Sequence, residues 1–169
     1  MEKKYRVLIV DDASFMRKAI QDILESDPEV EIAGLARNGR EGLEMIKELK
    51  PDVITLDMDI PVMDGLMAIR HIMVESPVPI VVLSSLFGNG AITFDALRLG
   101  AVDFVPKPSG AISKDIHTTG REIIDRIKMA ASVNLENFRR VHFARRNTIA
   151  ENTKPIESQP PEYILAVGT

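Results

Sequence analysis

The sequence predicts an α/β protein in which a doubly wound, five-stranded parallel sheet is covered by five helices. Short apolar runs rich in Val and Ile recur five times, and stretches with apolar residues at helical spacing lie between them. The runs are continuous rather than alternating, which is typical of strands that helices bury on both faces. Strands and helices that alternate through short connections predict parallel strands joined by right-handed crossovers.

The five apolar runs are too short for helices and are therefore interpreted as strands. The first is the clearest, because four apolar residues, Val7 to Val10, precede two adjacent carboxylates. The predicted strands are Tyr5–Val10, Val30–Ala36, Val53–Leu56, Pro79–Leu83 and Val102–Val105.

Each stretch that follows a strand carries one apolar stripe, as an amphipathic helix does. Boundary signals agree with five helices: Ser14 and Asn38 are candidate N-caps, Pro28 and Pro51 follow helix ends, and Gly100 is a candidate C-cap. The stripes are Met16, Ile20, Ile23 and Leu24; Leu43, Ile46 and Leu49; Leu66, Ile69 and Met73; Ile92, Ala96 and Leu99; and Ile123, Ile127 and Ala131.

A chain of 169 residues is long enough for one sizeable domain with an appendage. The α/β pattern covers residues 1–131, and the polar, Pro-containing segment 132–162 is interpreted as a linker. Residues 163–169, YILAVGT, are expected to form a strand that begins a further domain. The composition, 45% hydrophobic and 27% charged, is that of a soluble globular protein.

Several classes of function are excluded by composition. No apolar run reaches the roughly 18 residues that a membrane span needs, so we expect a cytoplasmic protein without membrane insertion. The absence of cysteine excludes disulfides and thiolate metal sites. The net charge is −4, and the arginines after residue 132 lack the pattern of a nucleic-acid site, which predicts no nucleic-acid partner.

The residues that directly follow the strands carry the chemistry. They are Asp11 and Asp12 after the first strand, Asp57 after the third, Ser84 after the fourth and Lys107 after the fifth. Because the carboxyl ends of parallel strands meet at one edge of the sheet, these side chains are expected to converge there.

Three carboxylates in one pocket repel one another, by roughly 4 kcal/mol for a pair about 4 Å apart at an effective dielectric of about 20. A hard dication removes this repulsion, and carboxylate oxygens are ligands that Mg²⁺ prefers. Lys107 lies between Pro106 and Pro108, which restrict its backbone. A fixed cation beside a metal-bound carboxylate suits an incoming phosphoryl group. The Ser84 hydroxyl could donate a hydrogen bond to a phosphoryl oxygen.

Four separated motifs agree with one known family: DD at residues 11–12, LDMDIPVMDG at 56–65, SS at 84–85 and KP at 107–108. Together they resemble the receiver domain of bacterial two-component response regulators, over about residues 5–131. The resemblance implies a flavodoxin-like fold with strand order 2-1-3-4-5, and phosphorylation of Asp57. It also implies that Asp12, Asp57 and the backbone carbonyl of Asp59 ligate Mg²⁺, with Asp11 acting through a metal-bound water.

The same resemblance implies roles for residues near the ends of the fourth and fifth strands. Ser84 and Lys107 would contact the phosphoryl group, and Phe104 would be the aromatic switch residue on the fifth strand. The peptide bond between Lys107 and Pro108 would be cis.

Further stretches resemble the receiver of the chemotaxis protein-glutamate methylesterase family, above all GAVDFVPKPSG at 100–110, with DDASFMRK at 11–18 and PDVITLD at 51–57. This implies a full-length hydrolase, a protein-glutamate methylesterase and protein-glutamine glutaminase. Its partners would be a chemotaxis histidine kinase as phosphoryl donor, methyl-accepting chemotaxis receptors as substrates, and its own C-terminal esterase domain. No residue of this chain is expected to belong to the esterase catalytic set, because no Ser has a His and a carboxylate at a recognisable spacing.

Two other functions remain open. Asp57 and Asp59 also resemble the paired aspartates of haloacid-dehalogenase-like phosphatases, although that motif normally ends the first strand and Pro61 departs from its pattern. A stand-alone receiver with a non-enzymatic output is the second alternative.

Overall fold

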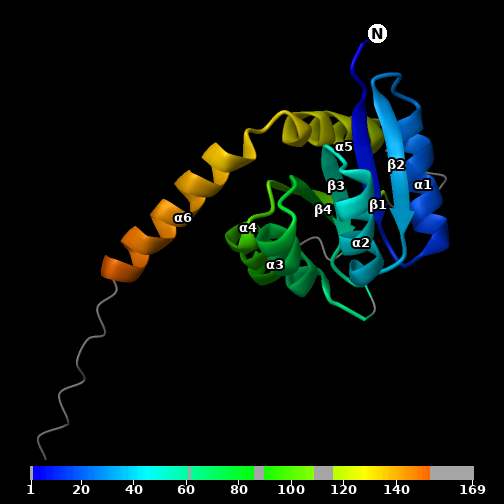
Figure 1. The fold of residues 1–169 in the computed structure, drawn as a ribbon. Helices are drawn as coiled ribbons and strands as arrows, with labels where there is room; N and C mark the ends of the chain where they lie inside the picture. The colour runs from blue at the N-terminus through cyan, green and yellow to red at the C-terminus, as the bar shows by residue number, and fades with distance from the viewer. Residues whose placement is uncertain (1, 61, 86–89, 109–115, 153–169) are drawn as a thin grey trace, which may run out of the picture.

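Five parallel strands form a single sheet of order β2-β1-β3-β4-β5 in the computed structural model, which describes residues 2–60, 62–85, 90–108 and 116–152 (Figure 1). This order and its parallel pairing confirm the predicted flavodoxin-like fold. The strands are β1 (Tyr5–Val10), β2 (Val30–Ala36), β3 (Val53–Asp57), β4 (Ile80–Ser84) and β5 (Asp103–Pro106).

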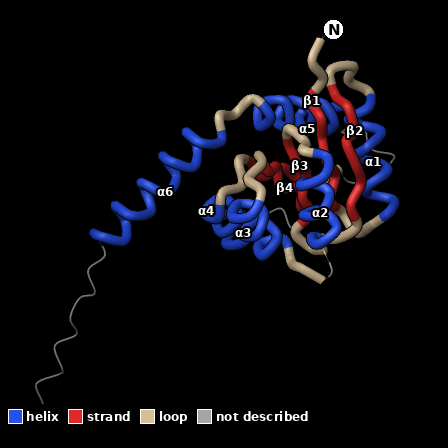
Figure 2. The backbone as a smooth tube through the Cα atoms, in the orientation of Figure 1, coloured by secondary structure: helices blue, strands red, loops and turns tan. Residues whose placement is uncertain are grey.

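Helices cover both faces of the sheet, which confirms the doubly wound arrangement (Figure 2). Side chains alternate along β1, so that Val7 and Ile9 pack with α1 and α5 while Leu8 and Val10 pack with α2, α3 and α4. The helices are α1 (Ser14–Glu25), α2 (Gly39–Leu49), α3 (Gly65–Glu75), α4 (Gly90–Leu99), α5 (Ile116–Ala131) and α6 (Leu135–Asn152).

The sixth helix corrects the prediction of five helices, and it lies within residues 132–162, the segment interpreted as a linker. Residues 135–152 contain no Gly or Pro, and the Asn134 side chain caps the helix by accepting from the Asn137 amide (3.0 Å). The helix touches α4 where the His142 ring donates from Nε2 to the Arg98 carbonyl (2.6 Å). Its sequence lacks a clear apolar stripe, so hydrophobic periodicity does not indicate a helix here. The strand expected at 163–169 lies outside the described residues.

Four of the five predicted helix boundaries are confirmed and one is wrong by a residue. Pro28 and Pro51 follow the ends of α1 and α2. The Asn38 side chain caps α2 by accepting from the Glu41 amide (2.9 Å), and Gly100 follows α4 with φ of 121°. Ser14, however, is the first residue of α1 rather than its cap. The Asp11 carboxylate accepts from the Ala13 amide (2.9 Å), which fixes the approach to the helix and leaves Ala13 at the capping position.

Among the described residues, no helix is both long and apolar enough to cross a membrane.

Candidate functional site

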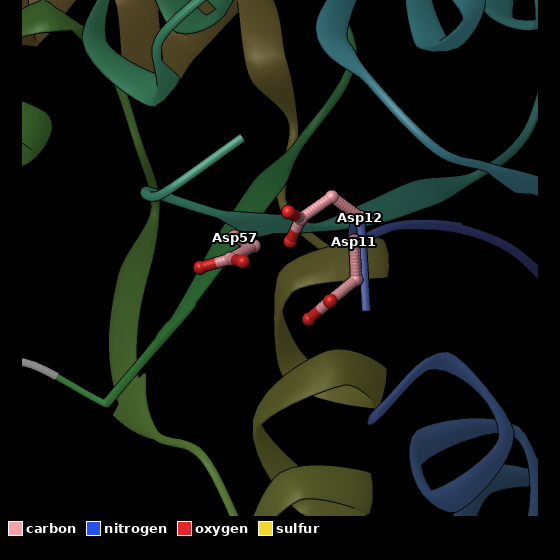
Figure 3. Close-up of side chains that lie close together, drawn as sticks. All are labelled: Asp11, Asp12 and Asp57. Atoms are coloured by element: carbon pink, nitrogen blue, oxygen red, sulfur yellow. The ribbon is translucent and has the colours of Figure 1, made fainter. Parts of the chain in front are cut away.

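Three carboxylates meet at the carboxyl edge of the sheet, as the sequence predicts (Figure 3). Val10 of β1 lies opposite Leu56 of β3, so the residues that follow these two also lie side by side. One oxygen from each of Asp11, Asp12 and Asp57 lies within 4.8 Å of the others. Asp11 and Asp57 are buried, with 1% and 3% of their surface exposed, whereas Asp12 is exposed.

The Lys107 ammonium bridges the two buried carboxylates. Its Nζ lies 2.9 Å from Asp11 Oδ2 and 2.8 Å from Asp57 Oδ2. The backbone amide of Lys107 donates to the carbonyl of Ser84 (3.0 Å), which ties the end of β5 to the end of β4. Lys107 follows β5, which is not adjacent to β1 or β3 in the sheet. Its long side chain reaches the carboxylates that follow β1 and end β3.

Burial and charge oppose each other in this cluster. Burial raises the pKa of the Asp11 carboxyl above its ordinary value, and the nearby Asp57 carboxylate adds to the rise, while Lys107 counteracts it. Burial disfavours the charged form of Lys107, but its hydrogen bonds to Asp57 and Asp11 outweigh this and raise its pKa. The ammonium therefore stays charged at neutral pH and holds the two carboxylates together.

Short backbone turns orient the carboxylates. Asp57 Oδ1 accepts from the Asp59 amide (3.1 Å), just as Asp11 Oδ1 accepts from the Ala13 amide. Gly65, the first residue of α3, brings the loop after β3 back onto the strand end, because its amide donates to the Met58 carbonyl (3.1 Å). A Cβ at Gly65 would lie 2.6 Å from Met58 Cα, so this close approach requires glycine.

The other predicted residues lie on or next to these strands and differ in their exposure. Ser84 ends β4 and is buried, and Phe104 on β5 is half-buried against the core beneath α3 and α4. Asp59 is exposed and contributes its backbone amide to the Asp57 turn. The metal-binding role of the Asp59 carbonyl stays a prediction.

One expectation is wrong in this structure: the peptide bond between Lys107 and Pro108 is not cis. The described residues contain no cis peptide bond. A bond before proline favours trans by about 0.5–1 kcal/mol unless the surroundings require otherwise. With the trans bond, Lys107 reaches both of its carboxylate partners.

Sequence reasoning missed the contribution of Arg17. Its Nη1 donates to the backbone carbonyls of Asp11 (2.7 Å) and Asp12 (3.2 Å). The residue falls inside the stretch DDASFMRK, whose family resemblance does not indicate this contact. A side chain that contacts backbone carbonyls leaves no signal in residue types, because every residue has a carbonyl.

The donor set fits a magnesium ion. Carboxylate oxygens from three residues converge, two of them buried, and such hard oxygen ligands are what Mg²⁺ prefers. The Lys107 ammonium contacts two of these three carboxylates, so a bound dication would further reduce their mutual repulsion.

Comparison with known proteins gives related sequences and structures. The family model for the response regulator receiver domain matches residues 7–118. The protein-glutamate methylesterase/protein-glutamine glutaminase of Caldanaerobacter subterraneus is 42% identical over 175 residues, an alignment that covers 99% of this chain and 48% of that protein. The chain thus spans about half the length of this relative.

Two solved structures are also similar. The crystal structure of the response regulator domain of Thermotoga maritima CheB is 43% identical with a TM-score of 0.71, covering 78% of this chain and 99% of that one. A chain from the crystal structure of the P1 domain of CheA3 in complex with CheY6 from R. sphaeroides is 32% identical with a TM-score of 0.65, covering 78% and 99%.

Replacement of Gly65 by alanine should destabilise the protein by about 2 kcal/mol, because the new Cβ would clash with the backbone of Met58. Urea unfolding followed by circular dichroism would measure the change. Gly90→Ala in the first turn of α4 is the matched control, since no atom of the described residues lies within 4 Å of its Cβ position, apart from its chain neighbours and its own helix backbone. Equal stability of the two variants would show that the close approach at Gly65 does not constrain the loop.

Proposed function

Because the chain belongs to the response regulator receiver domain family, we propose that it accepts a phosphoryl group on Asp57 and so controls the output of a longer protein. The position of Asp57 on the central strand carries this proposal. Strand β1, with Asp11 and Asp12 after it, lies on one side of β3, and Ser84 and Lys107 come from the other side. A group on Asp57 would therefore have Asp11 and Asp12 on one side and Ser84 and Lys107 on the other.

In the proposed reaction a carboxylate oxygen of Asp57 attacks the phosphorus of a phosphohistidine. A phosphorus–oxygen bond forms, the phosphorus–nitrogen bond breaks, and the imidazole nitrogen keeps the electron pair and takes up a proton from solvent. Asp11, Asp12 and Asp57 would hold Mg²⁺, with the backbone carbonyl of Asp59. When bound, the ion would neutralise part of the negative charge that gathers as the phosphoryl group approaches.

Lys107 and Ser84 would distinguish the two states of Asp57. In the structure Lys107 shares its ammonium between two carboxylates, and a phosphoryl group on Asp57 would offer it a more highly charged anion. We propose that Lys107 and the Ser84 hydroxyl move toward the phosphoryl oxygens and that Phe104, half-buried on β5, then changes rotamer. This would alter the face built from α4, β5 and α5.

The output that we propose is a protein-glutamate methylesterase and protein-glutamine glutaminase. The similarity to such proteins extends over 99% of this chain, beyond the residues matched by the receiver-domain model. Residues 1–131 would be the receiver, 132–162 the connection, which includes α6, and 163–169 the start of the esterase domain. The phosphoryl donor would be a chemotaxis histidine kinase, and the substrates methyl-accepting chemotaxis receptors, in the cytoplasm.

Incubation with acetyl phosphate and Mg²⁺ should label Asp57, and the labelled fraction can be measured with a phosphate-affinity gel and intact-protein mass spectrometry. Asp57→Ala should lose the label, as should the wild type in EDTA. Asp59→Ala is the matched control, because the exposed Asp59 is expected to act through its backbone, and this variant should still be labelled. Undiminished labelling of Asp57→Ala would refute the phosphoacceptor assignment.

A version of the protein extended to the full length of its relatives should release methanol from methylated receptors faster when Asp57 is phosphorylated. The reason is that the changed α4–β5–α5 face would no longer restrain the esterase domain. Asp57→Ala in the extended protein should keep the low basal rate whether or not acetyl phosphate is present. An extended protein that phosphorylates normally but never releases methanol would contradict the methylesterase assignment alone.

A further inference from the structure

Arg17 contacts the turn that carries two of the three clustered carboxylates. The residue lies in the first turn of α1, is half-buried, and donates from Nη1 to the carbonyls of both Asp11 and Asp12. On the opposite side, the Asp11 amide donates to the Ala36 carbonyl of β2 (3.0 Å). The peptide units after β1 are therefore held between β2 and the first turn of α1.

Asp12 has the greatest need of such support. Asp11 is buried and hydrogen-bonded through its carboxylate to the Ala13 amide and to Lys107, whereas Asp12 is exposed, so packing does not fix it. The contact from Arg17 to the Asp12 carbonyl limits rotation of the peptide unit that directs the Asp12 side chain. The carboxylates of Asp11 and Asp12 are thereby kept within reach of Asp57.

We propose that Arg17 is a positioning residue for the metal site, one that preorganises the Asp11–Asp12 turn for Mg²⁺. This inference rests on the proposed function, since the metal belongs to the proposed phosphoryl chemistry. Groups that orient metal ligands without touching the metal typically change its affinity by about 10- to 100-fold when they are removed. The role of Arg17 is separate from that of Lys107, which contacts the carboxylate oxygens themselves.

Charge and geometry predict opposite signs for the loss of Arg17. A guanidinium near the site repels a dication, so electrostatics alone predicts that a neutral residue at position 17 strengthens Mg²⁺ binding. The positioning role predicts that the same substitution weakens it, because the turn becomes free to adopt arrangements in which the carboxylates diverge. The sign of the change therefore separates the two effects.

The experiment measures the Mg²⁺ dissociation constant by calorimetry for the wild type, Arg17→Met, Arg17→Lys and Lys18→Met, together with the metal-free melting temperature. Lys18→Met is the matched control, because Lys18 adjoins Arg17 on α1 but pairs with Asp22 (2.7 Å) at the surface. Arg17→Met should weaken Mg²⁺ binding about 10-fold. Arg17→Lys, with the charge on a shorter side chain, should also weaken it, and Lys18→Met should not.

A second readout separates positioning from general damage to the fold. The rate of Asp57 labelling by acetyl phosphate in Arg17→Met should be low at limiting Mg²⁺ and return to the wild-type rate at saturating Mg²⁺. Binding by Arg17→Met that equals or exceeds that of the wild type would overturn the inference while leaving the proposed function intact. A wild type that binds no Mg²⁺ would overturn both. If Arg17→Met does not fold, undiminished Mg²⁺ affinity in Arg17→Lys would overturn the inference.

Discussion

The contact of the Lys107 ammonium with the carboxylates of Asp11 and Asp57 is the interaction on which this edge of the molecule depends. Two buried carboxylates without a cation between them would repel by roughly 4 kcal/mol at a separation of about 4 Å and an effective dielectric of about 20. A lysine at 2.9 and 2.8 Å converts this repulsion into an attraction between three charges. One ammonium does not balance three carboxylates, so the cluster keeps excess negative charge and can attract a dication.

The fold supplies this arrangement through strand order rather than through sequence proximity. Asp11, Asp57 and Lys107 follow β1, β3 and β5, and β4 separates β3 from β5. Parallel pairing brings the three ends to one edge. The loops add precision: Asp11 contributes to the start of α1 through the Ala13 amide, and Gly65 lets the loop after β3 close against Met58. The residues that begin helices here also orient the site.

Much of this could be predicted from the sequence, because strands buried on both faces and amphipathic helices leave strong periodic signals. The convergence of Asp11, Asp12, Asp57, Ser84 and Lys107 followed from their positions after strands, and the structure confirms it for the carboxylates and Lys107. Other features left no such signal. Helix α6 has no clear apolar stripe, and the trans bond before Pro108 depends on surroundings that residue types do not encode. Arg17 acts on backbone carbonyls, which look the same at every position.

The most direct test is the free energy of unfolding of the wild type and of Lys107→Met, measured with urea near pH 7.5 in EDTA and over a series of Mg²⁺ concentrations. Removing one partner of a buried ion pair typically destabilises by about 3–5 kcal/mol, because the remaining charges are left uncompensated. We therefore expect Lys107→Met to lose about 3 kcal/mol in EDTA and to recover most of this loss as Mg²⁺ is added. Equal stability of the two proteins in EDTA would show that the ammonium does not hold the carboxylates together, and would contradict the central role given to this contact.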